Sequence, residues 1–333
     1  MSWSPFQPRT SALAAALGGR ACYITGSWPG RSTALVPLRY LAHAAQMWRL
    51  LNRLRPRILI VVTAPVFAPL VGWLWCATHG VRLVVDCHTG AFHSRRWRWA
   101  RPIHRALLRR TQAALVHSEE DEAMVRAWGA PVLLLPDDLP DFGPPVAASS
   151  AGNHRIVIAG RLEADEPVAA VLAAAALTPG IEVRFTGDPR RLPSGLRSRA
   201  PANATFLGYL PYAEFLAELK AADAVGVFTT DPHVMSRAAF EAIAVGRPLI
   251  LSDHPGLRAR FGAAALFCRN QPDEMARVFR RAVSDRHGLT ERSQRLQGVL
   301  RAHRERALAE LRLRMTEAGL KSRAAVTTGL IEP

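Results

Sequence analysis

Short apolar runs alternate with longer segments of helical periodicity along most of the chain. Each short run predicts a buried strand, and each longer segment with apolar positions three or four residues apart predicts a helix. This alternation is typical of βαβ units built around a parallel sheet. In the first half we expect strands at 21–24, 57–62, 81–86, 113–117 and 131–135, and helices at 36–54, 66–79, 97–110 and 119–127.

A second alternating block follows the segment 137–153, which is rich in Pro, Gly, Ser and Ala and has no periodicity, so we interpret that segment as a linker. The second block predicts strands at 155–159, 182–186, 204–207, 224–228, 248–251 and 265–268, and helices at 167–177, 212–222, 235–245 and 273–284. Residues 290–318 predict one long arginine-rich helix that braces the two domains, with leucines on a recurring face: Leu296, Leu300, Leu308 and Leu311.

The expected fold class is therefore α/β, with two Rossmann-like, doubly wound parallel-sheet domains. The predicted domains are residues 1–145 and 154–288, followed by a C-terminal helix and tail at 289–333. Residues 58–77 are apolar and about long enough to span a bilayer. Because Pro65 and Pro69 interrupt this segment, we favour a buried strand, a turn and an apolar helix instead.

Composition adds a strong positive charge, with 43 Lys and Arg against 27 Asp and Glu. Such a field attracts phosphates or an anionic surface, although the arginine excess also fits a biased codon usage. The four cysteines, Cys22, Cys76, Cys87 and Cys268, show no metal-binding or disulfide spacing. The N-terminus lacks a secretory pattern, so a cytoplasmic location is expected.

In doubly wound sheets, ligands bind beyond the carboxyl ends of the strands. In the second half this rule selects four groups of residues: Gly160 and Arg161, Gly187 and Asp188, 229–233, and 252–256. The surrounding blocks are IVIAGRL, VRFTGDP, ATFLGYLPYAEFLAELKAADAVGVFT and HVMSRAAFEAIAVGRPLILSD. In this order and spacing they resemble the donor half of glycosyltransferase family 4 and related GT-B enzymes, whose two Rossmann-like domains face a cleft.

The resemblance implies a role for several of these residues. Glu241 matches the second glutamate of the family's E-x7-E element, which is expected to accept hydrogen bonds from the ribose of the nucleotide. Arg161 matches the basic residue of the GR motif, which is expected to neutralise the departing diphosphate. The lysine that usually follows is missing, and Glu166 lies near its place.

His233 stands where the family has its first glutamate. The spacing of His233, Arg237 and Glu241 places them on one face of the expected helix, so that the face offers a donor, a cation and a carboxylate. Residues 232–235 would then present backbone N–H groups and the positive end of the helix dipole to the diphosphate. The alternative for His233 is helix capping or packing.

The first half offers acceptor-side candidates. In VVDCHTGAF a strand ends in Asp86 and His88, and this block resembles the matching strand end of lipid-linked mannosyl- and glucosyltransferases. His88 could hydrogen-bond the transferred sugar or move a proton, and Asp86 could orient it or serve as a base. A core histidine and a structural cap are the alternatives. In the N-terminal loop WSPFQPRT, Arg9 and Thr10 could meet an acceptor phosphate.

The segment 93–110 interleaves arginines with tryptophans and leads into an amphipathic helix. Basic residues with interfacial tryptophans favour an anionic bilayer surface, here Arg95, Arg96, Trp97 and Trp99. An ordinary solvated surface or a nucleic-acid contact would use the same residues, but no nucleic-acid motif accompanies them, so we expect no nucleic-acid partner.

Together these features predict a glycosyltransferase that moves a hexose-type sugar from a UDP- or GDP-sugar to a lipid-linked or glycan acceptor, peripheral on the inner face of the cell membrane, in polysaccharide or glycolipid synthesis of the cell envelope. The expected catalytic residues are His88, Asp86 and His233. No cofactor and no metal are expected, because arginines and a helix terminus can stabilise the leaving group. The alternatives are a nucleotide-sugar epimerase of the same fold and a non-catalytic nucleotide-sugar-binding subunit of a polysaccharide assembly complex.

Overall fold

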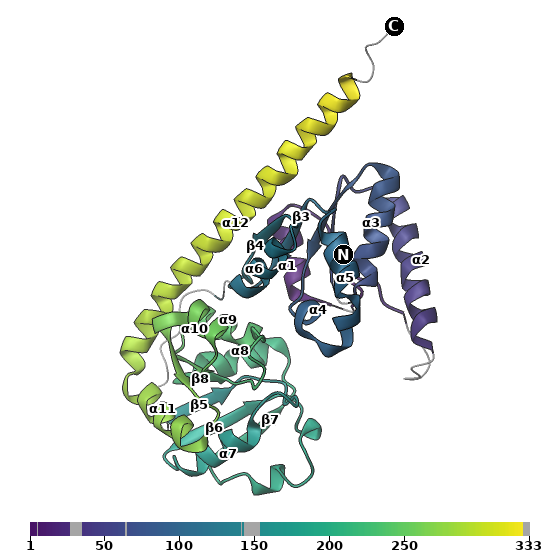
Figure 1. The fold of residues 1–333 in the computed structure, drawn as a ribbon. Helices are drawn as coiled ribbons and strands as arrows, with labels where there is room; N and C mark the ends of the chain where they lie inside the picture. Colours follow the sequence, from purple (N-terminus) through teal and green to yellow (C-terminus); the bar gives the residue numbers. More distant parts are fainter. Residues whose placement is uncertain (5, 27–34, 64, 141, 143–153, 329–333) are drawn as a thin grey trace. The chain divides into compact units, whose positions relative to one another are not determined.

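The computed structural model describes residues 1–4, 6–26, 35–63, 65–140, 142 and 154–328, with side chains described as far as residue 316 (Figure 1). The chain forms two compact units. The first comprises residues 1–137 and those from 303 onward, and the second comprises residues 138–302. The unit boundary therefore falls at 137/138 and again within the last helix, α12 (Arg286–Thr328), whereas the sequence predicts a separate C-terminal segment at 289–333.

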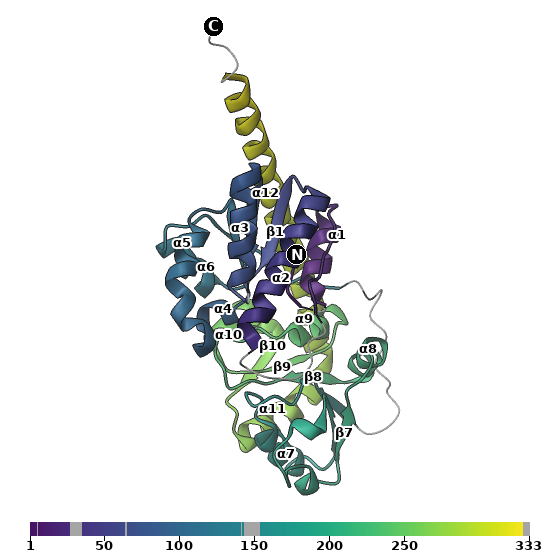
Figure 2. The same cartoon turned by 90° about the vertical axis from the view of Figure 1, so that its right-hand side faces the viewer.

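A four-stranded parallel sheet forms the centre of the first unit, in the order β1-β2-β3-β4; its strand β1 is labelled in Figure 2. Its strands are β1 (Ile58–Val62), β2 (Arg82–Asp86), β3 (Ala113–Val116) and β4 (Val132–Leu134), and its helices are α1 (Pro8–Ala16), α2 (Val36–Leu54), α3 (Phe67–His79), α4 (Gly90–His93), α5 (Arg101–Leu108) and α6 (Glu119–Ala127). The expected strand at 21–24 is reduced to a single parallel bridge between Ser2 and Tyr23.

The strands of this sheet are apolar throughout because both of its faces are covered. On one face, Trp75 of α3 and Met47 and Leu51 of α2 are fully buried. On the other, Leu308 and Leu311 of α12 pack in one cluster with Leu13, Val84, Leu115 and Leu133. The recurring leucine face predicted for the last helix is thus buried at these positions.

The apolar segment 58–77 is split as predicted, with β1 ending at Val62 and α3 beginning at Phe67. Within the part of the chain that the structure describes, every helix falls short of the length or apolar character needed to cross a membrane.

The second unit contains a six-stranded parallel sheet in the order β10-β9-β8-β5-β6-β7. Its strands are β5 (His154–Ile158), β6 (Ile181–Thr186), β7 (Ala204–Gly208), β8 (Ala224–Val227), β9 (Leu249–Ser252) and β10 (Ala265–Cys268), and its helices are α7 (Val168–Ala176), α8 (Tyr212–Ala221), α9 (Arg237–Ala244), α10 (Pro255–Phe261) and α11 (Pro272–Ser284). One face buries Phe279 of α11 with Val171 of α7, and the other buries Phe240 and Ile243 of α9. Both units are parallel-sheet α/β domains, so the expected α/β class is confirmed. The strand order reverses beside β5 in the second unit, as in a doubly wound sheet, whereas the four described strands of the first unit follow one another in a single direction.

Candidate functional site

The strand order of the second unit reverses next to β5. From β5 the chain winds through β6 and β7 on one side, and β8 then returns to the other side of β5. A ligand crevice is expected beyond the carboxyl ends of the strands at such a reversal. The residues that follow these two strands are Gly160 and Arg161 after β5 and Thr229 after β8.

The loops after β5 and β6 are packed directly on each other. Thr186, the last residue of β6, accepts a hydrogen bond from the backbone N–H of Gly160 at 3.1 Å. Gly187 has a φ of +101°, and a Cβ at this position would lie 2.7 Å from the carbonyl carbon of Arg161. Glycine at 187 therefore permits both the backbone conformation and the close approach of the two loops.

The predicted donor residue Asp188 has a local partner. Its carboxylate forms an ion pair with Arg190 at 2.8 Å, and hydrogen bonds from Arg190 lower the pKa of Asp188 to about 2. Asp188 also accepts a hydrogen bond from the backbone N–H of Arg190, which caps the short helical turn 189–191. In this structure its carboxylate is thus engaged with its own loop.

Arg161 is exposed, and its guanidinium has no hydrogen bond or ion pair with the described residues. The backbone around it is firmly held, because the Glu166 side chain accepts hydrogen bonds from the N–H groups of Arg161 at 2.9 Å and Leu162 at 3.0 Å. A cation is therefore available at the carboxyl end of β5, and a carboxylate lies beside it.

Glu241 is the centre of a polar group on α9. It is 5% exposed, and its Oε1 accepts hydrogen bonds from the Tyr212 hydroxyl at 3.0 Å and from Nε of Arg237 at 3.1 Å. Arg237 also donates to Asp138 at 3.0 Å. Burial raises the pKa of Glu241, against the opposing effect of these two donors. Burial and the neighbouring Glu241 raise the pKa of Tyr212 to about 12.

The predicted helix 235–245 begins later than expected, at Arg237, with Ser236 in an extended conformation before it. The prediction that His233 shares a helix face with Arg237 and Glu241 is therefore wrong. His233 precedes the helix, in a turn where its N–H donates to Asp231 at 2.9 Å. Because Asp231 and Thr229 satisfy this turn through local hydrogen bonds, the helix cannot extend back through it.

In the first unit, Arg9 is at the centre of a buried ion-pair network. Its Nε donates to both oxygens of Asp86 at 3.0 and 3.1 Å, and its two terminal nitrogens donate to Asp137 at 2.7 Å and to the Leu135 carbonyl at 2.9 Å. Burial alone would lower the pKa of Arg9, but Asp86 and Asp137 together raise it. Burial would likewise raise the pKa of Asp137, but Arg9 and His117 hold it well below its usual value.

This network changes how Arg9 and Thr10 are interpreted. Arg9, proposed from the sequence to meet an acceptor phosphate, is 5% exposed and ties the carboxyl ends of β2 and β4 together. The Thr10 hydroxyl donates to Gln7 at 2.9 Å, and Thr10 lines a mostly apolar cavity of about 360 Å³ in the first unit.

His88 follows β2, as predicted, and its side chain is exposed. Its backbone N–H donates to the Thr63 hydroxyl at 2.9 Å, and its Nδ1 accepts from the N–H of Gly90 at 3.2 Å. Desolvation by the surrounding protein and the neighbouring His117 lower the pKa of His88, so the ring is neutral at pH 7. A neutral ring that accepts at Nδ1 carries its proton on Nε2, which is then a hydrogen-bond donor.

The basic aromatic segment is partly buried. Trp97 was expected at a surface, but it is 9% exposed and packs with Val66 and Ala100. Trp99 is 58% exposed, and Arg95 and Arg96 are exposed on the same short helix, η2 (Arg95–Ala100). The ring of Trp97 also packs against the ring of Phe67, with 6.2 Å between the ring centroids.

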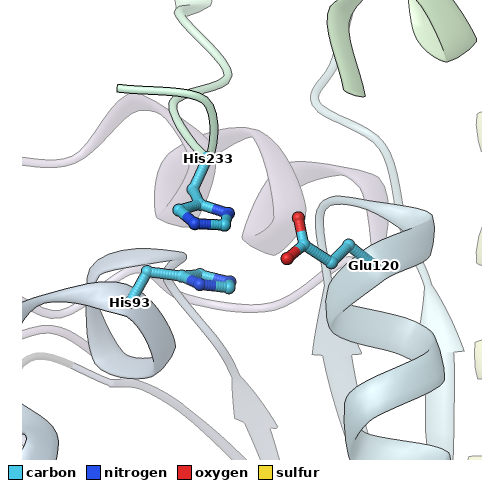
Figure 3. Close-up of side chains that lie close together, drawn as sticks. All are labelled: His93, Glu120 and His233. Carbon is cyan, nitrogen blue, oxygen red and sulfur yellow. The ribbon is translucent and has the colours of Figure 1, made fainter. Parts of the chain in front are cut away.

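His93 and Glu120 face each other in the first unit (Figure 3), from the end of α4 and the first turn of α6. Nε2 of His93 is hydrogen-bonded to Asp121 at 2.8 Å. This bond ties α4 to α6, because Asp121 is itself held at the start of α6 by the Ser118 cap at 3.1 Å.

The sequence does not identify three further polar residues of these sites, Tyr212, Asp165 and Asp137. Tyr212 lies in an expected helix, Asp165 in a loop and Asp137 in the expected linker. Asp165 accepts a hydrogen bond from the Thr229 hydroxyl at 3.1 Å. Asp137 could have been found, because it follows β4 and the same strand-end rule applies there. Tyr212 carried no such signal, since its contact with Glu241 depends on how α8 and α9 pack.

Comparisons with known proteins agree with this architecture. The sequence profile of Glycosyltransferase Family 4 matches residues 4–135, and that of Glycosyl transferases group 1 matches residues 147–285. The chain belongs to the family 4-like GT-B glycosyltransferases. It is therefore a glycosyltransferase, with the profile boundary close to the boundary between the two units.

Solved structures share the fold of this glycosyltransferase at low sequence identity. HepE of Anabaena in complex with UDP and glucose has a TM-score of 0.66 and 14% identity, covering 90% of this chain and 88% of its own. Sucrose-phosphate synthase of Thermosynechococcus elongatus has a TM-score of 0.68 and 17% identity, covering 94% and 92%. A glycosyltransferase of Rickettsia africae has a TM-score of 0.68 and 10% identity, covering 93% and 94%. A search of curated proteins found no match.

Proposed function

We propose that this glycosyltransferase moves a hexose-type sugar from a UDP- or GDP-sugar to a lipid-linked or glycan acceptor at the inner face of the cell membrane, in polysaccharide or glycolipid synthesis. The donor half of the proposal is supported by the second unit, and the acceptor half by the first. The similar fold of HepE, solved with UDP and glucose, adds support for the donor class.

The observation that carries the proposal is the buried carboxylate of Glu241. Burial raises the pKa of Glu241 because it removes water from the charged carboxylate. Hydrogen-bond donors that reach the carboxylate therefore stabilise its charge. A ribose offers two adjacent hydroxyl donors, and a carboxylate has two acceptor oxygens that match such a diol. Tyr212 and Arg237 both donate to Oε1 and fix the orientation of the carboxylate.

For the leaving diphosphate we propose stabilisation by arginine and by backbone N–H groups, without a metal ion. In the transfer, the bond between the anomeric carbon and the diphosphate oxygen breaks, and that oxygen keeps the electron pair. The acceptor hydroxyl oxygen forms the new bond, and its proton passes to the departing diphosphate oxygen or to water. The exposed Arg161 can stabilise the negative charge that develops on the leaving phosphate, because a guanidinium group binds phosphate through two parallel hydrogen bonds.

On the acceptor side we propose His88 as the group that hydrogen-bonds the transferred sugar. Its ring is exposed and neutral, and the contact with Gly90 leaves Nε2 as a donor. Asp86 is better suited to positioning than to acting as a base, because its two oxygens both accept from Arg9.

The membrane-associated acceptor is supported by an exposed apolar and basic surface of the first unit. Leu38 and Leu41 of α2 are 53% and 67% exposed, and Trp99 is 58% exposed. Aromatic rings connect α2 with η2, because the ring centroid of Phe67 lies 5.1 Å from that of Tyr40 in α2 and 6.1 Å from that of Trp99 in η2. Apolar side chains set among arginines suit the interface of an anionic bilayer.

The test is turnover. Purified protein would be incubated with UDP- and GDP-sugars, with and without a polyprenyl-phosphate-linked acceptor, and both the released nucleoside diphosphate and the sugar products would be measured. Acceptor-dependent release that is lost in Glu241→Gln supports the proposal. An epimerised nucleotide-sugar formed without acceptor would indicate the epimerase, and binding without turnover would indicate the binding subunit.

A further inference from the structure

A carboxylate occupies the backbone cradle at the carboxyl end of β5. The N–H of Arg161 donates to Oε1 of Glu166 at 2.9 Å, and the N–H of Leu162 donates to Oε2 at 3.0 Å. Leu162 has a φ of +60°, which is unfavourable for a leucine. A Cβ at Gly160 would lie 2.8 Å from the carboxyl carbon of Glu166. The loop is therefore shaped closely around this one anion.

Consecutive N–H groups that converge on one point bind anions in general, and phosphate is the usual ligand of such loops in doubly wound sheets. A carboxylate and a phosphate oxygen present similar charge and acceptor geometry to these donors. The exposed guanidinium of Arg161 lies on the residue that supplies one of the two N–H groups. The place where a donor phosphate would find both a cation and backbone donors thus already holds a negative charge.

We propose that Glu166 is an internal substitute for the donor phosphate, held in the cradle of Gly160, Arg161 and Leu162, and that it leaves the cradle when the nucleotide-sugar binds. This inference rests on the proposed function for its ligand, a nucleoside diphosphate. It makes Glu166 the residue that sets the affinity for the phosphates, because the ligand must displace it and its charge opposes theirs.

Two features support a carboxylate that can be displaced. Burial raises the pKa of Glu166, although the N–H groups of Arg161 and Leu162 oppose this effect. The adjacent Asp165 raises it further. The charge of Glu166 is therefore less favourable in the cradle than in water. Another anion that takes its place would accept from the same backbone N–H groups, so that no buried donor loses its partner.

The experiment compares Glu166→Gln with Glu163→Gln by isothermal titration with UDP, GDP, uridine and inorganic pyrophosphate. Glu163→Gln is the matched control, because Glu163 belongs to the same loop and its substitution removes the same charge. The carboxylate of Glu163, however, pairs with Arg191 outside the cradle. We expect Glu166→Gln to bind UDP and pyrophosphate about tenfold or more tightly than the wild type, since a like charge a few ångströms away is removed. Uridine should be unaffected, and Glu163→Gln should stay within about threefold of the wild type.

A Glu166→Gln protein that binds pyrophosphate no more tightly than Glu163→Gln would overturn the inference, as would an equal gain for uridine. Glu166→Ser serves as a second neutral variant if the glutamine protein is poorly folded, and the same gain is expected from it. If no nucleotide binds any variant while pyrophosphate follows the expected order, the proposed function fails and the cradle inference stands.

Discussion

Replacing Arg9 with methionine tests the buried ion-pair network of the first unit. Methionine keeps much of the side-chain volume but removes the donors to Asp86, Asp137 and the Leu135 carbonyl. Asp86 is 1% exposed, and the Asp137 side chain is 11% exposed, so both carboxylates would remain buried without their cation. Breaking a buried pair by removing one partner costs about 3–5 kcal/mol, and we expect Arg9→Met to lose about that much stability.

The assay is urea unfolding followed by tryptophan fluorescence. All eight tryptophans lie between Trp3 and Trp128 and therefore report the unfolding of the first unit. Arg126→Met is the matched control, because Arg126 forms an ion pair with Glu122 at 2.7 Å but is 66% exposed. An exposed pair contributes about 1 kcal/mol or less.

An Arg9→Met protein with a free energy of unfolding within about 1 kcal/mol of the wild type, or equal to that of Arg126→Met, would contradict a stabilising role for the buried network. Adding Asp86→Asn to Arg9→Met removes one of the unpaired charges and should recover part of the loss. A double variant less stable than Arg9→Met alone would also contradict the proposed cause.

Two further predictions concern stability. Burial lowers the pKa of His104 from 6.5 to about 4, so the folded first unit holds it neutral. The stability that this provides is complete above pH 6.5 and is lost as the pH falls, by roughly 3 kcal/mol near pH 4. His104→Leu should remove this contribution and so reduce the pH slope in tryptophan-monitored unfolding, while the lowered pKa values of His43 and His88 maintain the rest of the slope; an unchanged slope would count against the prediction. Gly187→Ala forces a Cβ onto Arg161 and should destabilise the second unit by about 2–3 kcal/mol in thermal unfolding followed by circular dichroism, whereas Gly180→Ala, which meets nothing within 4 Å, should not.

Much of the fold could be predicted from the sequence, because strands buried on both faces are continuously apolar and helices carry a regular apolar face. The helix bounds 36–54 and 119–127 and the strand 265–268 are confirmed without change. The strand expected at 21–24 fails because its local apolar pattern says nothing about the length of its pairing partner, and that pairing is limited to the bridge at Ser2.

The site residues were harder to predict, for two physical reasons. The strand-end rule finds which residues lie at the correct edge of a sheet, and it placed Arg161 and His88 there. It does not say which charges pair, so the buried contacts of Arg9 with Asp86 and Asp137 could not be foreseen from positions so far apart in the chain. Nor does helical spacing reveal that hydrogen bonds at Asp231 keep His233 outside α9.

The most direct test of the central claim compares a ribonucleoside diphosphate with its 2′,3′-dideoxy analogue, by calorimetric titration of the wild type and Glu241→Gln. A hydrogen bond to a charged group contributes about 1.5–3 kcal/mol, so the wild type should prefer the ribonucleotide by about tenfold or more. Glu241→Gln should weaken binding of the ribonucleotide and leave the dideoxy analogue nearly unaffected. Equal weakening of both ligands, or of neither, would contradict the assignment of Glu241 to the ribose and with it the proposed donor site.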